Sequence, residues 1–225
     1  MRLANQDLEK LTAKLGAQLV HARAAYAEAL ALVNAPDPAG RIVALFDPET
    51  YGAAGELALT PYQPIAPGVS FGFEGAGGKV SVTARPVASA LADAGGSCDC
   101  EVVIEGGEES RWISLELEVD LQFVRTPGMV TVSLFGSMEV PGGDFDAETC
   151  RVEMFCHDTD GTRRSLLRGS QPFVLPADHG IARADVRAAL PQGARIDETR
   201  PAMLVIFLSP QATRVTISDL ALTFG

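Results

Sequence analysis

The sequence is poor in the residues from which most catalytic and metal sites are built. It has three histidines, four cysteines and one tryptophan among 225 residues, and no GxSxG or HExxH pattern frames any histidine. The cysteines at positions 98, 100, 150 and 156 lack the CxxC-like spacing of a zinc site. We therefore predict no nucleophilic enzyme and no zinc protein, and we interpret the cysteines as buried thiols, with disulfide bonds or a metal site as the alternatives.

Long apolar runs are also missing. No window reaches the roughly 18 consecutive apolar residues that span a bilayer, and the first ten residues, MRLANQDLEK, contain no apolar core of a secretory signal peptide. We expect no membrane insertion and no signal-directed export. The localisation stays open between the cell exterior, as part of a particle, and the cytoplasm.

The charge balance limits the partners. A formal net charge of -11 and a pI near 4.7 oppose binding to duplex nucleic acid or to an anionic membrane surface, since both require a positive field. Hydrophobic residues make up 47% of the chain, which is ample for a packed core. Neutral ligands therefore remain the open class.

Residues 3–33 predict a long N-terminal α-helix, because they are rich in Ala, Leu, Glu, Lys and Gln and contain no proline. The apolar positions repeat in sevens over roughly four heptads. The two seam positions are occupied by Met1, Leu8, Leu15, Ala22 and Ala29, and by Ala4, Leu11, Gln18, Ala25 and Leu32. We favour a self-associating coiled coil, a dimer or a trimer, over an amphipathic helix packed on its own domain.

Prolines change the pattern after the helix. Six of them between positions 36 and 67 push the chain toward extended geometry. Three regions follow: a helix for oligomerisation or anchoring at residues 1–34, a proline-rich neck at 35–68 and a β-domain at 69–225. Within the neck, Ile42–Phe46 predicts one short strand. Tyr62 is expected to pack the neck onto the β-domain rather than to bind a ligand.

The clearest strand signal is Arg111–Phe123, where apolar and polar residues alternate with the two-residue period of a half-buried strand. Similar short runs, punctuated by Gly, Pro and Asp, are Val69–Glu74, Lys79–Thr83, Glu101–Glu105, Met129–Phe135, Thr149–His157, Arg163–Arg168, Gln171–Leu175, Met203–Leu208 and Arg214–Phe224. Arg85–Ala94 and Ala182–Leu190 predict helical turns. The fold class is therefore mainly β, an antiparallel jelly-roll-like sandwich after a long helix.

Two aromatic residues fall on the outward parity of their strands. Trp112 lies on the polar side of the central strand, and Phe155 lies on the polar side of Thr149–His157 with Arg151 and His157. An exposed ring can meet the C–H face of a sugar while charged neighbours bond its hydroxyls. The candidate ligand-binding residues are Trp112, Glu116, Arg151, Phe155 and His157. Burial of the rings against a sister subunit is the alternative.

Two acidic patterns need a separate interpretation. Glu116, Glu118 and Asp120 share one parity, and alternate strand residues lie about 6.5 to 7 Å apart, within the spacing that glycoside hydrolysis uses. A solvated strand face accounts for them better. Asp158 and Asp160 resemble the opening of a calcium loop without its closing Glu. A hairpin turn with Gly161 in the left-handed conformation is preferred over Ca²⁺.

The closing run Arg214–Gly225, RVTISDLALTFG, resembles the last strand of carbohydrate-binding-module-like jelly rolls. A polar Ser218-Asp219 step interrupts its apolar alternation, and it follows a long loop and the hydrophobic strand Met203–Leu208. The resemblance covers residues 68–225 and implies a non-catalytic sugar-binding sandwich, without assigning binding residues. The helix, neck and β-domain together are similar in layout to short fibre or spike proteins of phages and phage-like particles.

These observations converge on a non-catalytic protein that binds a cell-surface glycan or polysaccharide through a sandwich carried on a self-associating helix. A larger particle or scaffold is a further expected partner. The rival is a purely structural module whose outward aromatics lie in subunit contacts. A glycoside-active enzyme comes third.

Overall fold

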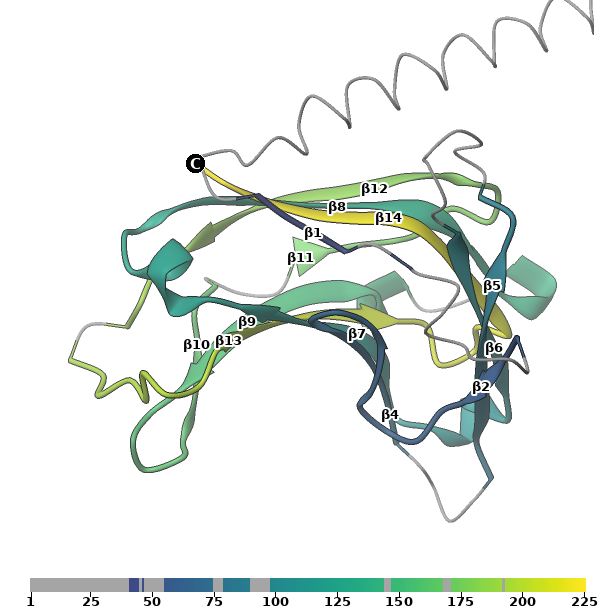
Figure 1. Ribbon diagram of the computed structural model, residues 1–225, viewed down its shortest axis with the longest axis horizontal. Coiled ribbons are helices and arrows are strands. Elements are labelled where there is room, and N and C mark those ends of the chain that lie inside the picture. Colours follow the sequence, from purple (N-terminus) through teal and green to yellow (C-terminus); the bar gives the residue numbers. More distant parts are fainter. Residues whose placement is uncertain are drawn as a thin grey trace, which may run out of the picture.

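Strands in which apolar and polar residues alternate build two antiparallel sheets that pack face to face (Figure 1). The computed structural model describes residues 41–44, 46, 55–74, 79–89, 98–143, 147–167, 171–191 and 193–225. Every strand pairing within these residues is antiparallel. The mainly β sandwich that the sequence predicts is confirmed.

The first sheet has β14 near its centre. Its order is β12 (Gly180–Ala188), β8 (Gly128–Glu139), β14 (Arg214–Phe224), β6 (Asp99–Glu105), β5 (Ser81–Val87) and β2 (Leu57–Ala58), and β1 (Arg41–Ala44) also pairs with β14. In β14 the register shifts between Ile217 and Asp219. Ser218 is the extra residue of this bulge, and its hydroxyl donates to the Asp99 carboxylate at 2.6 Å.

In the second sheet, β7 lies between β13 and β4. Its order is β10 (Arg163–Ser165), β9 (Arg151–His157), β13 (Ala202–Leu208), β7 (Ile113–Val119), β4 (Val69–Phe73) and β3 (Gln63–Ala66), and β11 (Gln171–Pro172) also pairs with β9. Thus β1, β2 and β3, which lie in the stretch expected as a neck, supply strands to both sheets.

The core fills the space between the sheets. Ile113, Leu115, Leu117 and Val119 of β7 are at most 1% exposed, and they meet a shared cluster that includes Leu134 of β8. These are the alternate apolar residues that the sequence pattern identifies, and they face the core. All four cysteines are buried as well.

Two local predictions are wrong. Ala182–Leu190 is not a helical turn, because most of it belongs to β12, where Ala182, Ala184, Val186 and Ala188 are buried between exposed neighbours. The helix propensity of alanine yields here to pairing with β8. In addition, the central strand ends at Val119 and not at Phe123. The Asp120 carboxylate accepts the Gln122 N–H at 2.9 Å and caps the 3-10 turn η3 (Leu121–Val124).

Smaller differences concern the bounds of single elements. Of the predicted turn Arg85–Ala94, residues 85–87 belong to β5, and residues 90–94 lie outside the described residues. The short strand predicted at Ile42–Phe46 appears as β1, Arg41–Ala44. The helix predicted for residues 3–33 lies outside the described part of the chain. The described residues contain no helix with the length and apolarity that a bilayer crossing requires.

Candidate functional site

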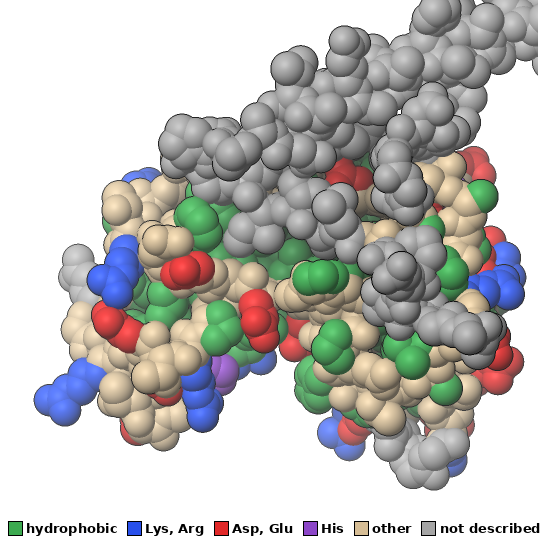
Figure 2. All heavy atoms as spheres, viewed as in Figure 1, with side chains coloured by type: hydrophobic (Ala, Val, Ile, Leu, Met, Phe, Trp, Pro, Cys, Tyr) green, Lys and Arg blue, Asp and Glu red, His purple; other side chains and the backbone are tan. Residues whose placement is uncertain are grey.

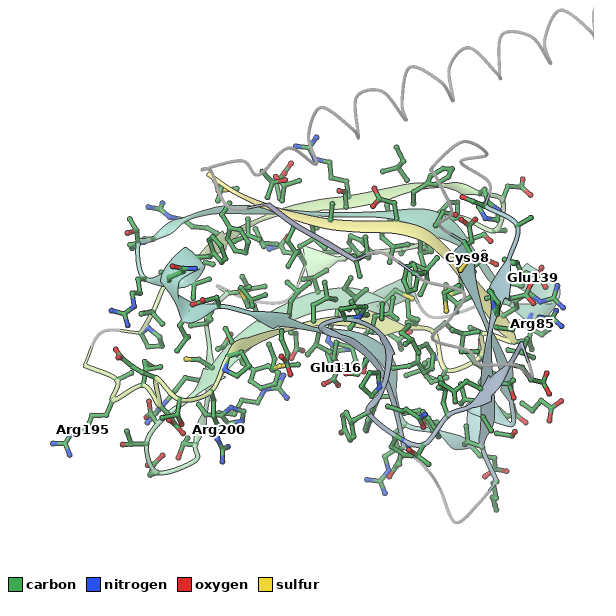
Figure 3. The ribbon with its side chains drawn as sticks, viewed as in Figure 1. Arg85, Cys98, Glu116, Glu139, Arg195 and Arg200 are labelled. Carbon is green, nitrogen blue, oxygen red and sulfur yellow. The ribbon has the colours of Figure 1, made fainter. Side chains whose placement is uncertain are left out.

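The outer face of the second sheet is hollowed. Strands β9, β13, β7 and β4 arch together (Figure 1), and the space-filling view shows a hollow open to solvent between two lobes (Figure 2). Glu116 points from β7 into this hollow (Figure 3). We call this face, with the side chains on it, the groove.

Strand register determines which side chains meet in the groove. Three rows cross neighbouring strands: Phe155, Met203 and Glu118; Glu153, Val205, Glu116 and Ser70; and Arg151, Phe207, Ser114 and Gly72. Apolar residues of β13 therefore separate an acidic strand, β7, from a mixed-charge strand, β9. Within one row, the β9 and β7 residues lie about 10 Å apart across β13, which is two strand spacings.

An aromatic pair forms one side of the groove. The rings of Tyr62 and Trp112 lie 5.6 Å apart at 37°, and Tyr62 is 54% exposed. Gly72 provides the space beneath the indole, since a Cβ there would lie 3.0 Å from Trp112 Cζ3. Tyr62 adopts φ of 65°, a left-handed conformation that is rare for a side chain of this size. Such strain is found most often at binding sites.

A partly buried carboxylate lies next to this pair. Glu116 Oε1 accepts the Ser114 hydroxyl at 3.1 Å, and Ser114 itself is fully buried. Burial raises the pKa of Glu116, while the Ser114 hydrogen bond and the Arg163 charge act in the opposite direction. Glu116 is thus a hydrogen-bond acceptor held in a fixed direction within a partly dry site.

Two arginines form the other side. Arg151 and Arg163 both donate to Glu153, at 3.0 and 3.2 Å. The Arg163 guanidinium lies 3.5 Å from the ring centroid of Phe155, and the Arg151 guanidinium lies 4.3 Å from that of Phe207. Stacking and ion pairing hold both guanidinium groups over aromatic rings of this face.

The two sides act on each other electrostatically. The pKa of Tyr62 is raised by burial and by the negative charge of Glu116, and Arg163 lowers it. Tyr62, Glu116 and Arg163 thus influence one another through their charges across the groove. The site therefore combines a ring surface, a carboxylate acceptor and a cationic donor.

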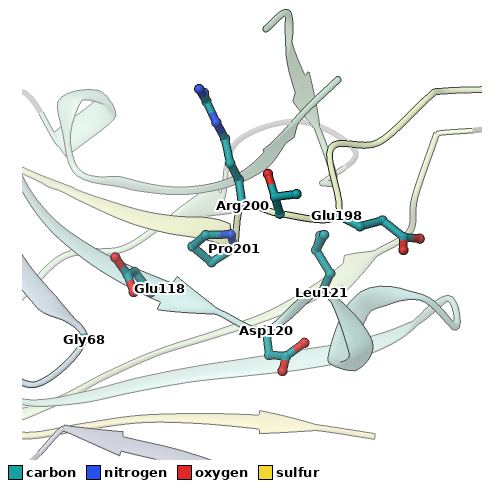
Figure 4. A pocket seen from close by; sticks show the side chains of 8 residues that line it. Gly68, Glu118, Asp120, Leu121, Glu198, Arg200 and Pro201 are labelled. Atoms are coloured by element: carbon teal, nitrogen blue, oxygen red, sulfur yellow. The ribbon is translucent and has the colours of Figure 1, made fainter. Parts of the chain in front are cut away.

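A polar pocket adjoins the groove at the end of β7. Its volume is about 550 Å³, and it is lined by Gly68, Glu118, Asp120, Leu121, Glu198, Thr199, Arg200 and Pro201 (Figure 4). Its loop is fixed by Asp197, whose carboxylate accepts the Thr199 N–H at 3.0 Å and pairs with Arg200 at 3.4 Å. The pKa of Asp197 is lowered mainly by its hydrogen bonds from Thr199.

Comparison with known proteins finds distant structural similarity only. No family model matches the chain, and no curated protein matches it. Similar solved structures include the enzymatically active domain of bacteriophage CBA120 tailspike protein 4, with 10% identity and a TM-score of 0.44, covering 80% of this chain and 20% of the tailspike chain.

Two others are isolated carbohydrate-binding modules. CtCBM11 has 10% identity and a TM-score of 0.42, covering 77% of this chain and 98% of that one. The CBM22-1 xylan-binding domain of Paenibacillus barcinonensis Xyn10C has 12% identity and a TM-score of 0.38, covering 81% of this chain and 92% of that one. These structures agree with the weak resemblance to carbohydrate-binding-module jelly rolls that the sequence shows. The chain spans only a fifth of the tailspike chain.

The residues proposed from sequence all lie on this face or at its edge. Trp112 and Glu116 face the groove as expected. Phe155 is on the outer face but only 9% exposed, because Arg163 covers its ring, and His157 packs edge-on against Phe155 at 5.4 Å. Arg151 is occupied by Glu153 and Phe207.

Two contributors were not foreseen. Tyr62 lies in a proline-flanked segment without alternation, and only the pairing of β3 with β4 brings it beside Trp112. Arg163 begins the short strand β10, and the hairpin after His157 folds it back over Phe155. The outward aromatic Phe155 was the one signal for Arg163, since an exposed ring on a sheet attracts a covering guanidinium.

The acidic turn near this site is a hairpin with internal partners. Asp158 is buried and accepts the Arg164 Nε–H at 2.7 Å, and Asp160 accepts the Thr162 N–H at 2.8 Å. Gly161 has φ of 84°, as a turn glycine should. The Thr162 hydrogen bonds lower the pKa of Asp160. Within the described ranges no group of three or more His, Cys, Asp or Glu side chains could hold a metal.

Proposed function

We propose that this protein is a non-catalytic glycan-binding sandwich whose ligand lies in the groove of the second sheet. The observation that carries the proposal is the Tyr62–Trp112 ring pair, 5.6 Å between centroids, beside a partly buried Glu116 and a stacked Arg163. A pyranose has an apolar C–H face and a polar hydroxyl edge. The groove offers the matching pair of surfaces.

Each group has a defined part in this binding. The exposed Tyr62 ring and the half-buried Trp112 ring pack against the sugar face, and Gly72 allows the indole to lie close to the sheet. Glu116 accepts from sugar hydroxyls. Arg163 donates from a guanidinium already immobilised by Phe155 and Glu153, so little side-chain entropy is lost when the ligand binds.

The carboxylates of the groove are arranged for binding rather than hydrolysis. Glu116 turns toward Ser114, while Glu118, the next acid on the strand face, lines the pocket at the far end of β7. Glu153, two strands away, is neutralised by Arg151 and Arg163. A glycosidase needs an acid and a second carboxylate facing one bond, and the ion pairs of Glu153 with the two arginines oppose such a role for this carboxylate.

A glycan array followed by titration calorimetry tests the proposal. Wild type should bind one class of polysaccharide, and Trp112→Ala should weaken binding at least roughly tenfold, the loss typical of a central aromatic anchor. The matched control is Ile181→Ala, which removes a residue of β12 that is 58% exposed on the first sheet. Absence of binding by wild type, or equal binding by both variants, overturns the proposal.

Hydrolysis is measured on the same ligand. We expect the chain length of the bound polysaccharide to stay constant over long incubation. Release of reducing ends by wild type, abolished in Glu116→Gln, would convert the assignment to a glycoside-active enzyme.

We further propose that several copies of the groove are presented together. A predicted self-associating helix at residues 3–33 would carry several grooves toward a cell-surface glycan, as part of a fibre, spike or larger particle, and avidity would strengthen weak single sites. A purely structural module is the rival. In that case Trp112 would lie between subunits, Trp112→Ala would weaken assembly, and tryptophan fluorescence would shift to the blue on association.

A further inference from the structure

A second cavity lies at the end of the first sheet and is apolar in character. It has a volume of about 270 Å³ and lies between η3, the start of β8 and the end of β14, lined by Gln122, Phe123, Thr126, Pro127, Gly128, Met129, Val130, Ala188, Phe224 and Gly225. We call it the terminal pocket. Contiguous apolar surface of this kind can mark an interaction site.

The terminal pocket has a rigid frame. The rings of Phe123 and Phe224 stack with 5.0 Å between centroids at 18°. Met129 and Gly225 exchange two backbone hydrogen bonds, each 3.0 Å long. Met129 is nevertheless 46% exposed, so its flexible thioether presents an adaptable apolar surface at the mouth.

The chain itself leads to this pocket. Strand β1 pairs with β14 in antiparallel register, with Arg41 opposite Thr223 and Ile42 opposite Leu222. Thr223 is followed in the chain by Phe224 and Gly225, and both of these residues line the terminal pocket. The polypeptide that precedes Arg41 therefore starts from its edge.

The preceding sequence contains apolar residues that the predicted coiled coil does not use. Leu19, Tyr26 and Val33 recur every seven residues next to the seam, whereas the equivalent earlier positions are the polar Asn5 and Thr12. Leu30 lies three residues before Val33, hence on the same side of a helix. The second half of the predicted helix, nearest the β-domain, thus has a further apolar side, while its seam has only small alanines at 22, 25 and 29.

We propose that the terminal pocket is the docking site of this chain's own N-terminal segment, with Leu30 and Val33 as the residues that enter it. Val33 precedes Arg41 by eight residues, which can span up to about 28 Å. The sequence of this connection contains Pro36 and Pro38, and proline favours an extended conformation in the residue before it. Docking fixes the base of the predicted helix against the sandwich and leaves the first-half seam residues Leu8, Leu11 and Leu15 for self-association.

This inference is independent of glycan binding, because none of the residues lining the terminal pocket belongs to the three rows of the groove. The two proposals can therefore fail separately.

Methionine oxidation in the full-length protein provides the test. Peroxide should oxidise Met129 slowly in wild type, although its exposure in the sandwich is high. Leu30→Asp should raise its oxidation rate roughly tenfold, since one buried leucine contributes at least that factor to docking. Leu8→Asp is the matched control and should leave Met129 protected. Met138 and Met154, both at most 2% exposed, report whether each variant remains folded.

Two outcomes overturn the proposal. One is rapid oxidation of Met129 in wild type, unchanged by Leu30→Asp. The other is protection that disappears on dilution, which would show that a second copy of the chain covers the pocket. Protection independent of protein concentration and lost in Leu30→Asp supports docking within one chain.

Discussion

Trp112 lies directly over Gly72: a Cβ added at Gly72 would lie 3.0 Å from the indole Cζ3, 2.6 Å from Ser114 Oγ and 2.9 Å from Glu116 Oε1. One missing methyl group therefore allows three groove side chains to keep their positions. Gly72→Ala should destabilise the fold by about 1 to 3 kcal/mol through overpacking and weaken glycan binding. Denaturant unfolding and calorimetry measure the two effects. Ser70→Ala, two residues away on the same face, is the control and should change neither greatly.

A substitution at Tyr62 should change glycan affinity without a large change in stability. Tyr62→Gly removes the exposed ring and relieves a left-handed backbone conformation of a non-glycine residue. Relief of strain and the greater unfolded-state entropy of glycine oppose each other, so the free energy of unfolding should stay within about 1 kcal/mol of wild type. Glycan affinity should fall roughly tenfold with the lost ring contact.

Tyr62→Phe keeps the ring and is the matched variant for this experiment. It should retain most of the affinity, because the stacking surface is unchanged and only the hydroxyl is lost. A Phe variant as weak as the Gly variant would mean that the hydroxyl, and not the ring, makes the contact.

Glu116 should make stability depend on pH. Burial raises its pKa in the folded protein, so the folded state holds this proton more tightly than the unfolded state. Its unfavourable contribution is absent below the unfolded pKa near 4.5 and develops as pH rises through the folded pKa. Glu116→Gln should therefore be more stable than wild type at pH 7 and should lose that advantage at pH 4.

Thermal unfolding at the two pH values checks this prediction. Glu118→Gln replaces an exposed acid on the same strand and serves as the control. An equal gain for both variants at pH 7 would point to general relief of the chain's negative charge instead of burial at position 116.

We expect Arg164 to contribute to the stability of the fold, and we expect calcium to have no effect on it. The Arg164 guanidinium bonds the buried Asp158 carboxylate at 2.7 Å, and this partner raises the pKa of Arg164. Arg164→Ala leaves a buried carboxylate without its cation, which destabilises proteins strongly, so the melting temperature should fall. EDTA or added CaCl₂ should leave the wild-type melting temperature unchanged.

Arg195→Ala is the matched control, since Arg195 projects into solvent at the edge of the molecule (Figure 3). A melting temperature that drops on chelation would contradict this interpretation and would restore a metal at Asp158 and Asp160.

Local alternation was sufficient to predict the sandwich but not the groove. The period-two pattern of Arg111–Phe123 correctly placed Leu115 inside and Trp112 and Glu116 outside. Which side chains of a strand are buried follows from the alternation within that strand, so the sequence of one strand is enough to predict it. Tyr62 and Arg163 reach the groove only through the pairings of β3 with β4 and β10 with β9. Such register between separate segments leaves no trace in a single sequence.

The wrong prediction at Ala182–Leu190 has a related cause. Its alternating pattern was present, with alanine or valine at every second position, but small side chains give a faint period-two signal and a strong helix propensity. Pairing with nine residues of β8 decides between the two. Helix propensity is worth tenths of a kcal/mol per residue and is easily exceeded by such pairing.

The position of β14 has a consequence for biogenesis. This strand, residues 214–224, hydrogen-bonds to β8, β6 and β1, so the first sheet cannot close until β14 has left the ribosome. Until then β6 and β8 present unpaired edges, which are open to association with other chains. The first sheet should therefore assemble only after β14 has been synthesised, and truncation within β14 should yield insoluble protein instead of a smaller domain.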